Sequence, residues 1–589
     1  MNSLRYRLIQ KKYREFLLPT LLITTANNLT SFVDMLLISA FLGANRMPAV
    51  QLCFPVVAFV SVFHGMIGIG GSLVAASAQA DHDENEGNRI FSISMSTVLG
   101  IGILITFIGT VMKPGIVSML CGDMAIQNDV ASYYSVLVLG FPLMCFLTCL
   151  SFFVKTDGCA RIASDSIVIS NLVNLCMDCI LMKGFGAGLE GAAAATITGY
   201  ICGIIFLLIN YGRYSRRQFR FVNPFSIDAA SFFRRFNEIC MKGFSTASVW
   251  FYLMITIQVL NRLTLTYGGK TGIEVYSLCR NSLSVCYIFF IGISQTMSPI
   301  VGAYAHEGDY DRVRFILKRS IKLVLAAALI LAAVFAAFPG IILFLYGVAQ
   351  TRSADYIDNI RIFTLLYPGL AFTFLMNYYF QAIGKIKLSK RLTILEGLLL
   401  PIGLACILAP LLHMSGIWIA MILSENISAV SIIVILLINR YGNHAAGAES
   451  FLLPLNHEAS RYEFSVKTDT AEVVRMSEKA SQYIEGRTDR KTALITGMAL
   501  EEMLTGIVLA NHDSGEVIDV VIQDMENQIA ISIKHMGVGF NPLIYDEDLD
   551  YSFDNAAVLK KISSKIEYDL LLGINSTLIQ VNKTSVPGH

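Results

Sequence analysis

Three polar residues, Asn171, Asn174 and Asp178, lie inside an otherwise apolar stretch of this sequence. Their spacing of three and four residues places all three side chains on one face if the stretch is helical. An ionisable group in an apolar span is costly and usually faces a cavity or a pathway, so the pattern predicts a functional polar site. The alternative is structural: the amides join neighbouring helices, and hydrogen bonds hold a neutral Asp178.

Other polar residues occupy the apolar segments before this stretch. Asn27 and Asp34 are seven residues apart, which is two helical turns, and therefore share a face. His64 lies in the next apolar segment, where a histidine satisfied within the core is the alternative to a functional one. We take Asn27, Asn171 and His64 as candidates for a substrate pathway.

The elements that must position these residues are membrane spans. The chain has 589 residues, of which 54% are hydrophobic and 15% charged, and a mean hydropathy of +0.59. This composition is typical of a multispanning membrane protein. The formal net charge of +1 gives no reason to expect nucleic acid as a partner.

Apolar segments of about 20 residues are long enough to span a bilayer as helices. They predict an all-α polytopic fold with twelve transmembrane helices in two six-helix bundles. The expected spans are 16–42, 51–79, 90–112, 131–154, 163–183, 190–212, 242–266, 272–303, 322–346, 360–383, 391–412 and 416–438. Basic residues concentrate before the first span, in the central loop and after spans eight and ten, so both termini are expected to be cytoplasmic.

These spans define the expected domains. They are a cytoplasmic lead-in (1–15), the first bundle (16–212), a cytoplasmic connecting loop (213–241), the second bundle (242–440), a linker (441–459) and a cytosolic domain (460–589). We expect a multi-pass protein of the inner or plasma membrane, monomeric in the lipid bilayer.

The two sets of spans resemble each other. Gly68, followed about twenty residues later by Arg89, is matched by Gly292 and Arg312 in the second set. Such a repeat predicts two related bundles with a pathway between or within them. The span equivalent to the Asn171–Asp178 segment offers Glu396 but no row of Asn and Asp, which places the predicted cation site in the first bundle.

The segments 32–43, 170–181, 184–196 and 298–312 resemble signature regions of the multidrug and toxic compound extrusion (MATE) transporters, and the likeness over about residues 10–440 is closest to the DinF-like branch. The resemblance implies a cation site at Asp34, Asn174, Asp178 and Thr196. It also implies antiport of small, often cationic, organic compounds against H⁺ or Na⁺, with no enzymatic activity and no required cofactor. Two carboxyl groups facing one cavity can exchange a proton, and carboxylate, amide and hydroxyl oxygens can instead ligate Na⁺.

The sequence after residue 444 is mixed and soluble in character. It predicts an α/β sandwich with strands near 463–466, 516–522, 528–533 and 576–581, and helices near 470–484, 490–511 and 556–566. Its order resembles the Bergerat-like ATP-binding domain of the GHKL superfamily, with Glu502, Gly537 and Gly539 matching the family's boxes. Gly506 replaces the magnesium-binding Asn, and His535 replaces the adenine-reading Asp. We therefore expect a degenerate nucleotide pocket, little or no ATP binding, no ATPase or kinase activity, and a regulatory module able to bind a cytosolic protein.

Two alternative functions are compatible with the sequence. One is a lipid-linked oligosaccharide flippase of the same superfamily, although the spans are poor in the Arg and Lys that a pyrophosphate requires. The other is a membrane-embedded sensor whose tail acts as an anti-sigma-like or kinase switch.

Overall fold

The computed structural model describes residues 6–80, 83–121, 126–213, 219–222, 229–347, 353–442, 451–453, 461–486, 488–511, 517–525, 528–541, 559, 562–571 and 574–583. The chain forms two compact units. One comprises Thr20–Ser294 and Ser320–Val434, and the other comprises Met1–Pro19, Gln295–Arg319 and Ile435–His589.

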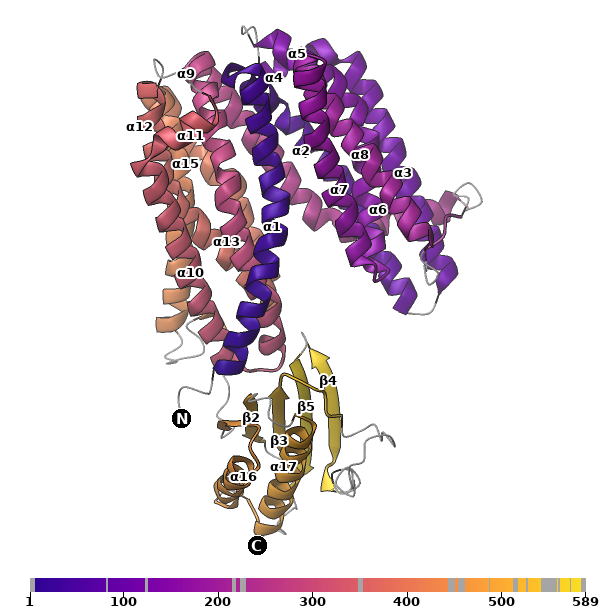
Figure 1. Cartoon of the computed structure of the whole chain (residues 1–589), viewed down its shortest axis with the longest axis vertical. Helices are drawn as coiled ribbons and strands as arrows, with labels where there is room; N and C mark the ends of the chain where they lie inside the picture. Colours follow the sequence, from indigo (N-terminus) through magenta and orange to yellow (C-terminus); the bar gives the residue numbers. More distant parts are fainter. Residues whose placement is uncertain are drawn as a thin grey trace. The chain divides into compact units, whose positions relative to one another are not determined.

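The part of the chain before the C-terminal sheet is helical (Figure 1). Its α-helices are α1 (Arg7–Leu42), α2 (Met47–Ala80), α3 (Glu84–Val111), α4 (Lys113–Cys121), α5 (Gln127–Leu137), α6 (Phe141–Thr156), α7 (Ala160–Asp178), α8 (Gly188–Arg213), α9 (Ala229–His306), α10 (Tyr310–Ala337), α11 (Pro339–Leu345), α12 (Ser353–Phe363), α13 (Tyr367–Ala382), α14 (Ile386–Ile394) and α15 (Leu400–Gly442).

Within the described residues, ten helical stretches are long and apolar enough to cross a membrane. One of them, Arg490–Ala510, lies in the C-terminal domain and packs its apolar side chains into the core of that domain. Two others, in α9 and α15, each extend over two predicted spans. The two spans meet at a kink with non-helical backbone angles, at Gly269 in α9 and at His413 in α15. Membrane-spanning helices are therefore present, and the number twelve stays a prediction.

A wide helical turn occurs at matching places in the two halves of the chain. A π-helical segment (Cys179–Gly184) follows Asp178 at the end of α7, and a second one (Leu395–Leu399) contains Glu396 between α14 and α15. Such turns interrupt regular helices and are frequent at functional sites. Both carboxyl residues singled out by the sequence in these spans therefore sit at a break in helical geometry.

Close packing of α7 and α8 brings polar groups of both helices together. A Cβ atom at Gly199 of α8 would lie 2.5 Å from the carbonyl oxygen of Ser170 on α7, and one at Gly203 would lie 2.9 Å from the Ser170 side chain. Only glycine permits this approach, as is common where membrane helices pack on each other. The approach positions α8 beside the Asn174 face of α7.

Helix α1 contacts elements of the second half of the chain. The Thr24 hydroxyl donates a hydrogen bond of 3.1 Å to the carbonyl of Ile288 on α9, and Phe32 packs edge-to-face on Tyr346 with ring centroids 5.8 Å apart. A Cβ atom at Gly292 would lie 2.9 Å from the Thr24 hydroxyl, so the two helices approach closely. Because Asp34 follows on the same helix, α1 links the site residues to the second set of spans.

The C-terminal domain contains an antiparallel sheet of five described strands, β1 (Arg461–Lys467), β2 (Val517–Asp524), β3 (Gln528–His535), β4 (Lys565–Leu571) and β5 (Ile574–Asn582), in the order β1-β2-β3-β5-β4. Helices α16 (Thr470–Glu485) and α17 (Arg490–Ala510) bury Val473, Met476, Leu500 and Leu504 with alternate residues of the strands. Alternation along strands directs every second side chain to this helix-covered face.

Most predicted elements of this domain are confirmed. The expected strands correspond to β1, β2, β3 and β5, and two expected helices correspond to α16 and α17. Strand β4 was missed, although Ile566, Tyr568 and Leu570 alternate with polar residues. The helix expected at 556–566 lies largely outside the described residues, and its end is wrong because β4 begins at Lys565.

Candidate functional site

The sequence-predicted carboxyl residues of α1 and α7 meet in the structure. Asp34 and Asp178 interact through a side-chain hydrogen bond. In each residue the Oδ1 atom is buried and has no hydrogen-bond partner among the described residues. Two carboxyl groups thus face each other, with one unsatisfied oxygen on each.

Two polar side chains complete this cluster. Asn174, one turn before Asp178, donates through Nδ2 to Asp178 Oδ2 at 3.4 Å and lies 3.3 Å from the Thr196 hydroxyl on α8. The Thr196 hydroxyl also lies 3.2 Å from the carbonyl of Ala192, to which it donates. The four residues predicted as the cation site, Asp34, Asn174, Asp178 and Thr196, therefore form one connected group, which we call the acidic cluster.

Sequence reasoning missed two tyrosines that lie near this group. Tyr133 on α5 interacts electrostatically with Asp34 and Asp178, and Tyr200 on α8 interacts with Asp34. Tyr200 follows Thr196 by one helical turn, so its place on the same face of α8 was readable from spacing alone. No pattern in the sequence singled out Tyr133.

The residues predicted for a substrate pathway are not joined to the acidic cluster by the described interactions. His64 is buried on α2, and Asn171 is half-buried on α7. The side chain of Asn27 lies outside the described part of the chain. A pathway role for these three residues stays a prediction.

The second half of the chain contains a pair of acidic residues that the sequence pattern revealed only in part. The Thr373 hydroxyl on α13 lies 3.1 Å from Glu396 Oε1 and 3.4 Å from Glu425 Oε2 on α15. Arg280 on α9 interacts electrostatically with Glu425 and by a hydrogen bond with Tyr287. Glu396 was identified from the sequence. Its partner Glu425 lies in the following span, where no row of Asn and Asp residues at helical spacing marked it as a site.

The glycine predicted at the degenerate nucleotide pocket is covered by an aromatic ring. Gly506 lies on α17, one turn after the half-buried Glu502. A Cβ atom at position 506 would lie 2.6 Å from the Phe540 ring. Phe540 therefore occupies the space that a longer side chain at this position would need.

The remaining residues predicted for this pocket lie on and after β3. His535 is buried at the end of β3, and its carbonyl accepts a hydrogen bond of 3.5 Å from Asn575. Gly537 has a φ of 121°, which favours glycine, and a Cβ atom at Gly539 would lie 2.5 Å from the Tyr568 hydroxyl. Asn511, at the end of α17, also contacts the loop that contains Gly537 and Gly539. Its side-chain amide donates a hydrogen bond of 3.0 Å to the Val538 carbonyl and accepts one of 2.8 Å from the Val538 N–H. The loop is thus fixed by two asparagines.

Comparison with known proteins identifies relatives of the helical part. The MatE family model matches residues 19–180 and 243–407, which is more than half of the chain. The chain is 23% identical over 432 residues to the multidrug export protein MepA of Staphylococcus haemolyticus, covering 72% of this chain and 92% of that protein.

Solved structures share this fold at low sequence identity. An inward-facing multidrug resistance MATE family transporter of the MOP superfamily aligns with a TM-score of 0.62 and 22% identity, over 69% of this chain and 92% of that one. An outward-facing structure of such a transporter aligns with a TM-score of 0.55 and 20% identity, over 73% and 95% of the two chains. The MATE multidrug transporter DinF-BH, solved in complex with a ligand, aligns with a TM-score of 0.59 and 20% identity, over 75% and 97%.

Proposed function

The chain belongs to the MATE family of transporters, and we propose that it exports small organic compounds in exchange for a cation that binds at the acidic cluster. It is a membrane transporter and not an enzyme. Inward- and outward-facing structures of related fold are in keeping with alternating access. The observation that carries the proposal is the convergence of Asp34 from α1 with Asp178 from α7.

The carboxyl contact favours a proton as the coupling ion. An ionised carboxylate only accepts hydrogen bonds, so two carboxyl groups hydrogen-bond each other only when one of them carries a proton. Asn174 donates to Asp178, which stabilises the negative charge that remains on the pair. We therefore propose that the pair holds one proton, with Na⁺ as the alternative occupant of the same oxygens.

Loading and release of the ion would act through α1. Its Asp34 contacts α7, while Thr24 on the same helix contacts α9. A bound ion shifts the balance between two conformations only by its different affinity for them. The two carboxyl groups belong to different helices. A shared proton favours their contact, and loss of the proton makes the two charges repel and separates the helices. The proton therefore binds more tightly to the conformation in which the two groups are in contact.

The names of the relatives support a proposal for the class of substrate. MepA is named a multidrug export protein, and the ligand-bound structure of related fold is that of a multidrug transporter. We therefore propose that bulky organic compounds, often cationic, are the cargo. We place the protein in the plasma membrane with both termini in the cytoplasm, and we assign a regulatory role to the C-terminal domain.

Uptake into inverted membrane vesicles tests the proposal. A fluorescent organic cation is supplied under an imposed proton gradient or sodium gradient to vesicles holding the wild type, Asp34→Asn or Asp178→Asn. An asparagine keeps the volume but cannot exchange a proton, so we expect gradient-driven uptake to be lost in both variants. The control is Asp165→Asn, which changes an exposed carboxylate of the same helix α7, paired with Arg161 at 3.8 Å.

The gradient that drives uptake identifies the coupling ion. Uptake driven by the proton gradient alone supports the shared proton, and uptake driven by sodium alone replaces it with Na⁺. Wild-type uptake by Asp178→Asn at equal expression would remove the acidic cluster from the mechanism. Transport of a lipid-linked oligosaccharide instead of the dye would favour the flippase alternative.

A further inference from the structure

One face of the C-terminal sheet carries charged residues that are not exposed to water. Ser465, Asp519 and Lys534 are direct cross-strand neighbours on β1, β2 and β3. They point away from the core that α16 and α17 form, because their sequence neighbours Phe464, Val520 and Ile533 belong to that core. An antiparallel sheet covered by helices on one side usually leaves the other side to solvent. Here Asp519 is 1% exposed and Lys534 is 5% exposed.

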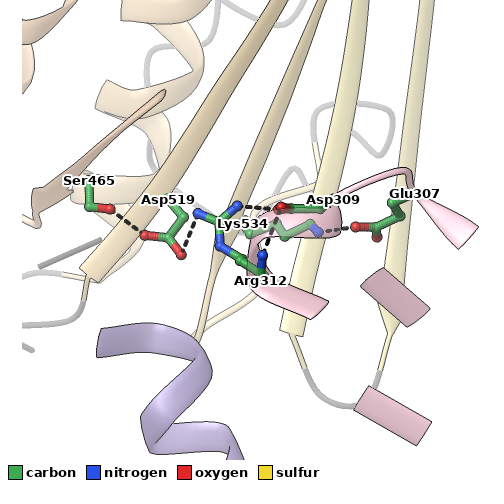
Figure 2. A network of polar contacts seen from close by, with 6 residues as sticks. All are labelled: Glu307, Asp309, Arg312, Ser465, Asp519 and Lys534. Carbon is green, nitrogen blue, oxygen red and sulfur yellow. Dashed lines mark hydrogen bonds and ion pairs between the residues drawn. The ribbon is translucent and has the colours of Figure 1, made fainter. Parts of the chain in front are cut away.

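The covering element is the turn between α9 and α10 (Figure 2). The guanidinium of Arg312 lies 3.0 Å from Asp519 and also pairs with Asp309. Lys534 pairs with Glu307 and lies 4.1 Å from the centroid of the Tyr304 ring. We call residues 304–312 the docking turn and the row Ser465, Asp519 and Lys534 the outer face of the sheet.

The charges of the two surfaces complement each other. Asp519 on the sheet faces Arg312 on the turn, and Lys534 faces Glu307. Arg312 is itself only 1% exposed. A buried charge is costly unless it is paired and hydrogen-bonded. Each surface therefore supplies the opposite charges that the buried charges of the other surface require. Ser465 completes the arrangement by donating a hydrogen bond of 2.6 Å to Asp519.

The start of α1 joins the same contact. Leu8 forms a small apolar cluster with Met536 and Ile574 of the C-terminal domain. Tyr6 stacks on Phe315 of α10 with ring centroids 4.2 Å apart. The C-terminal domain thus contacts both the docking turn and the helix that continues to Asp34.

We propose that the outer face of the sheet is a docking surface for the turn between α9 and α10, and that docking restrains transport by holding this turn and the start of α1 together. The second half of this statement rests on the proposed transport function. A domain fixed to two helices that must move during alternation stabilises one arrangement over others. Release of the domain is therefore expected to speed transport, and a ligand that frees the outer face would activate the protein.

Hydrogen exchange of the full-length protein tests the docking. Asp519→Asn and Arg312→Gln each remove one charge of the central pair, and the double variant removes both. We expect amides of β2, β3 and the docking turn to exchange at least tenfold faster in each single variant. The double variant should show less than the sum of the two effects, because Asp519 and Arg312 then no longer leave each other unpaired.

Matched controls separate docking from general loss of charge. Arg89 occupies the position equivalent to Arg312 in the first half of the chain, but its side chain is 50% exposed and its pair with Glu86 is 3.9 Å long. Glu567 is an exposed carboxylate of β4 that pairs with its neighbour Lys565. Arg89→Gln and Glu567→Gln should leave exchange in the docking turn unchanged.

Vesicle uptake measured on the same variants tests the restraint. We expect the initial rate to rise at least twofold in Asp519→Asn and in the double variant. Unchanged exchange in Asp519→Asn and Arg312→Gln would overturn the docking surface. Faster exchange with an unchanged or lower uptake rate would leave the docking but overturn the restraint. If the wild type transports nothing under either gradient, the proposed function fails, and hydrogen exchange still decides the docking.

Discussion

The Thr196 hydroxyl on α8 lies 3.3 Å from the amide nitrogen of Asn174 on α7 and accepts its hydrogen bond. The same amide lies 3.4 Å from Asp178 Oδ2. Asn174 thus links the hydroxyl of one helix to the carboxyl group of the other, and Thr196 controls where the amide points. The geometry makes Thr196 a positioning residue for the acidic cluster.

We predict that Thr196→Val weakens ion coupling. Valine keeps the shape of the side chain but removes the acceptor, and one hydrogen bond contributes about 0.5–1.5 kcal/mol. We expect a shift of about two- to tenfold in the ion concentration that gives half-maximal uptake. Thr196→Ser retains the hydroxyl and should stay close to the wild type. A serine variant as impaired as the valine variant would assign the effect to packing.

Glu425 is predicted to stabilise the second half of the chain through Arg280. The two residues interact electrostatically inside the spans, so Glu425→Gln leaves the guanidinium without its counter-charge. Arg280 and Glu425 are each only half-buried, so the loss should be smaller than the about 3–5 kcal/mol of a fully buried pair. We expect a clearly lower melting temperature for purified Glu425→Gln.

A double variant checks the source of this loss. Glu425→Gln combined with Arg280→Gln should recover part of the stability, since it removes the unpaired charge. Glu396→Gln should cost less, because the described interactions of Glu396 are with Thr373, Tyr287 and Glu425 and include no positive charge. Equal losses in Glu396→Gln and Glu425→Gln would contradict the role of Arg280.

Gly506→Asn is predicted to destabilise the C-terminal domain instead of creating a magnesium site. The new Cβ atom would lie 2.6 Å from the Phe540 ring, and overpacking of this kind costs about 1–3 kcal/mol. Phe540→Ala combined with Gly506→Asn should recover part of that loss. Hydrogen exchange of α17 in the full-length protein reports both effects, and calorimetry with Mg-ATP should detect no binding to either variant. Magnesium-dependent ATP binding by Gly506→Asn alone would refute the prediction.

How far the sequence predicted the site depends on the spacing of its residues. Asn174 and Asp178 lie one turn apart on one helix, so spacing alone placed them on one face. The contact of Asp178 with Asp34 joins helices distant in sequence, and only the resemblance to a family led to it. Glu425 was missed because it forms its pair across two spans, where periodicity within one helix carries no information.

The same limit applies to the C-terminal domain. Local patterns predicted four of its strands, whereas β4 was overlooked because a helix was expected to extend to residue 566. Asp519 interrupts the apolar run Val517–Ile522, a pattern typical of a strand buried on both faces, whereas Lys534 lies between Ile533 and His535 and gives no such signal. Neither pattern shows which part of the chain covers this face. Burial of this face follows from its contact with residues 304–312, which the sequence separates from β2 by a whole set of spans.

The contact between Asp519 and Arg312 is predicted to depend on pH. Burial raises the pKa of Asp519 above its ordinary value, while Arg312, Ser465 and Lys534 oppose the shift and Asp309 adds to it. Arg312→Gln removes the largest opposing influence, so the pKa of Asp519 in the docked state should rise further. A carboxyl group with a raised pKa in the folded state binds its proton more tightly there than in the open state. The free energy of opening must then fall as pH rises from the ordinary pKa to the raised one.

The stability deficit of Arg312→Gln relative to the wild type is therefore expected to grow from pH 5 to pH 8, by at most about 1.4 kcal/mol per pH unit. Burial lowers the pKa of Lys534, against the effects of Glu307 and Asp309, and Arg312 makes only the smallest of its contributions, so Arg312→Gln changes the pKa of Lys534 less than that of Asp519. The measurement is the opening free energy of β2 amides from hydrogen exchange, corrected for the intrinsic rate at each pH. A deficit that stays constant or shrinks as pH rises would show that Asp519 does not depend on Arg312 for its charge.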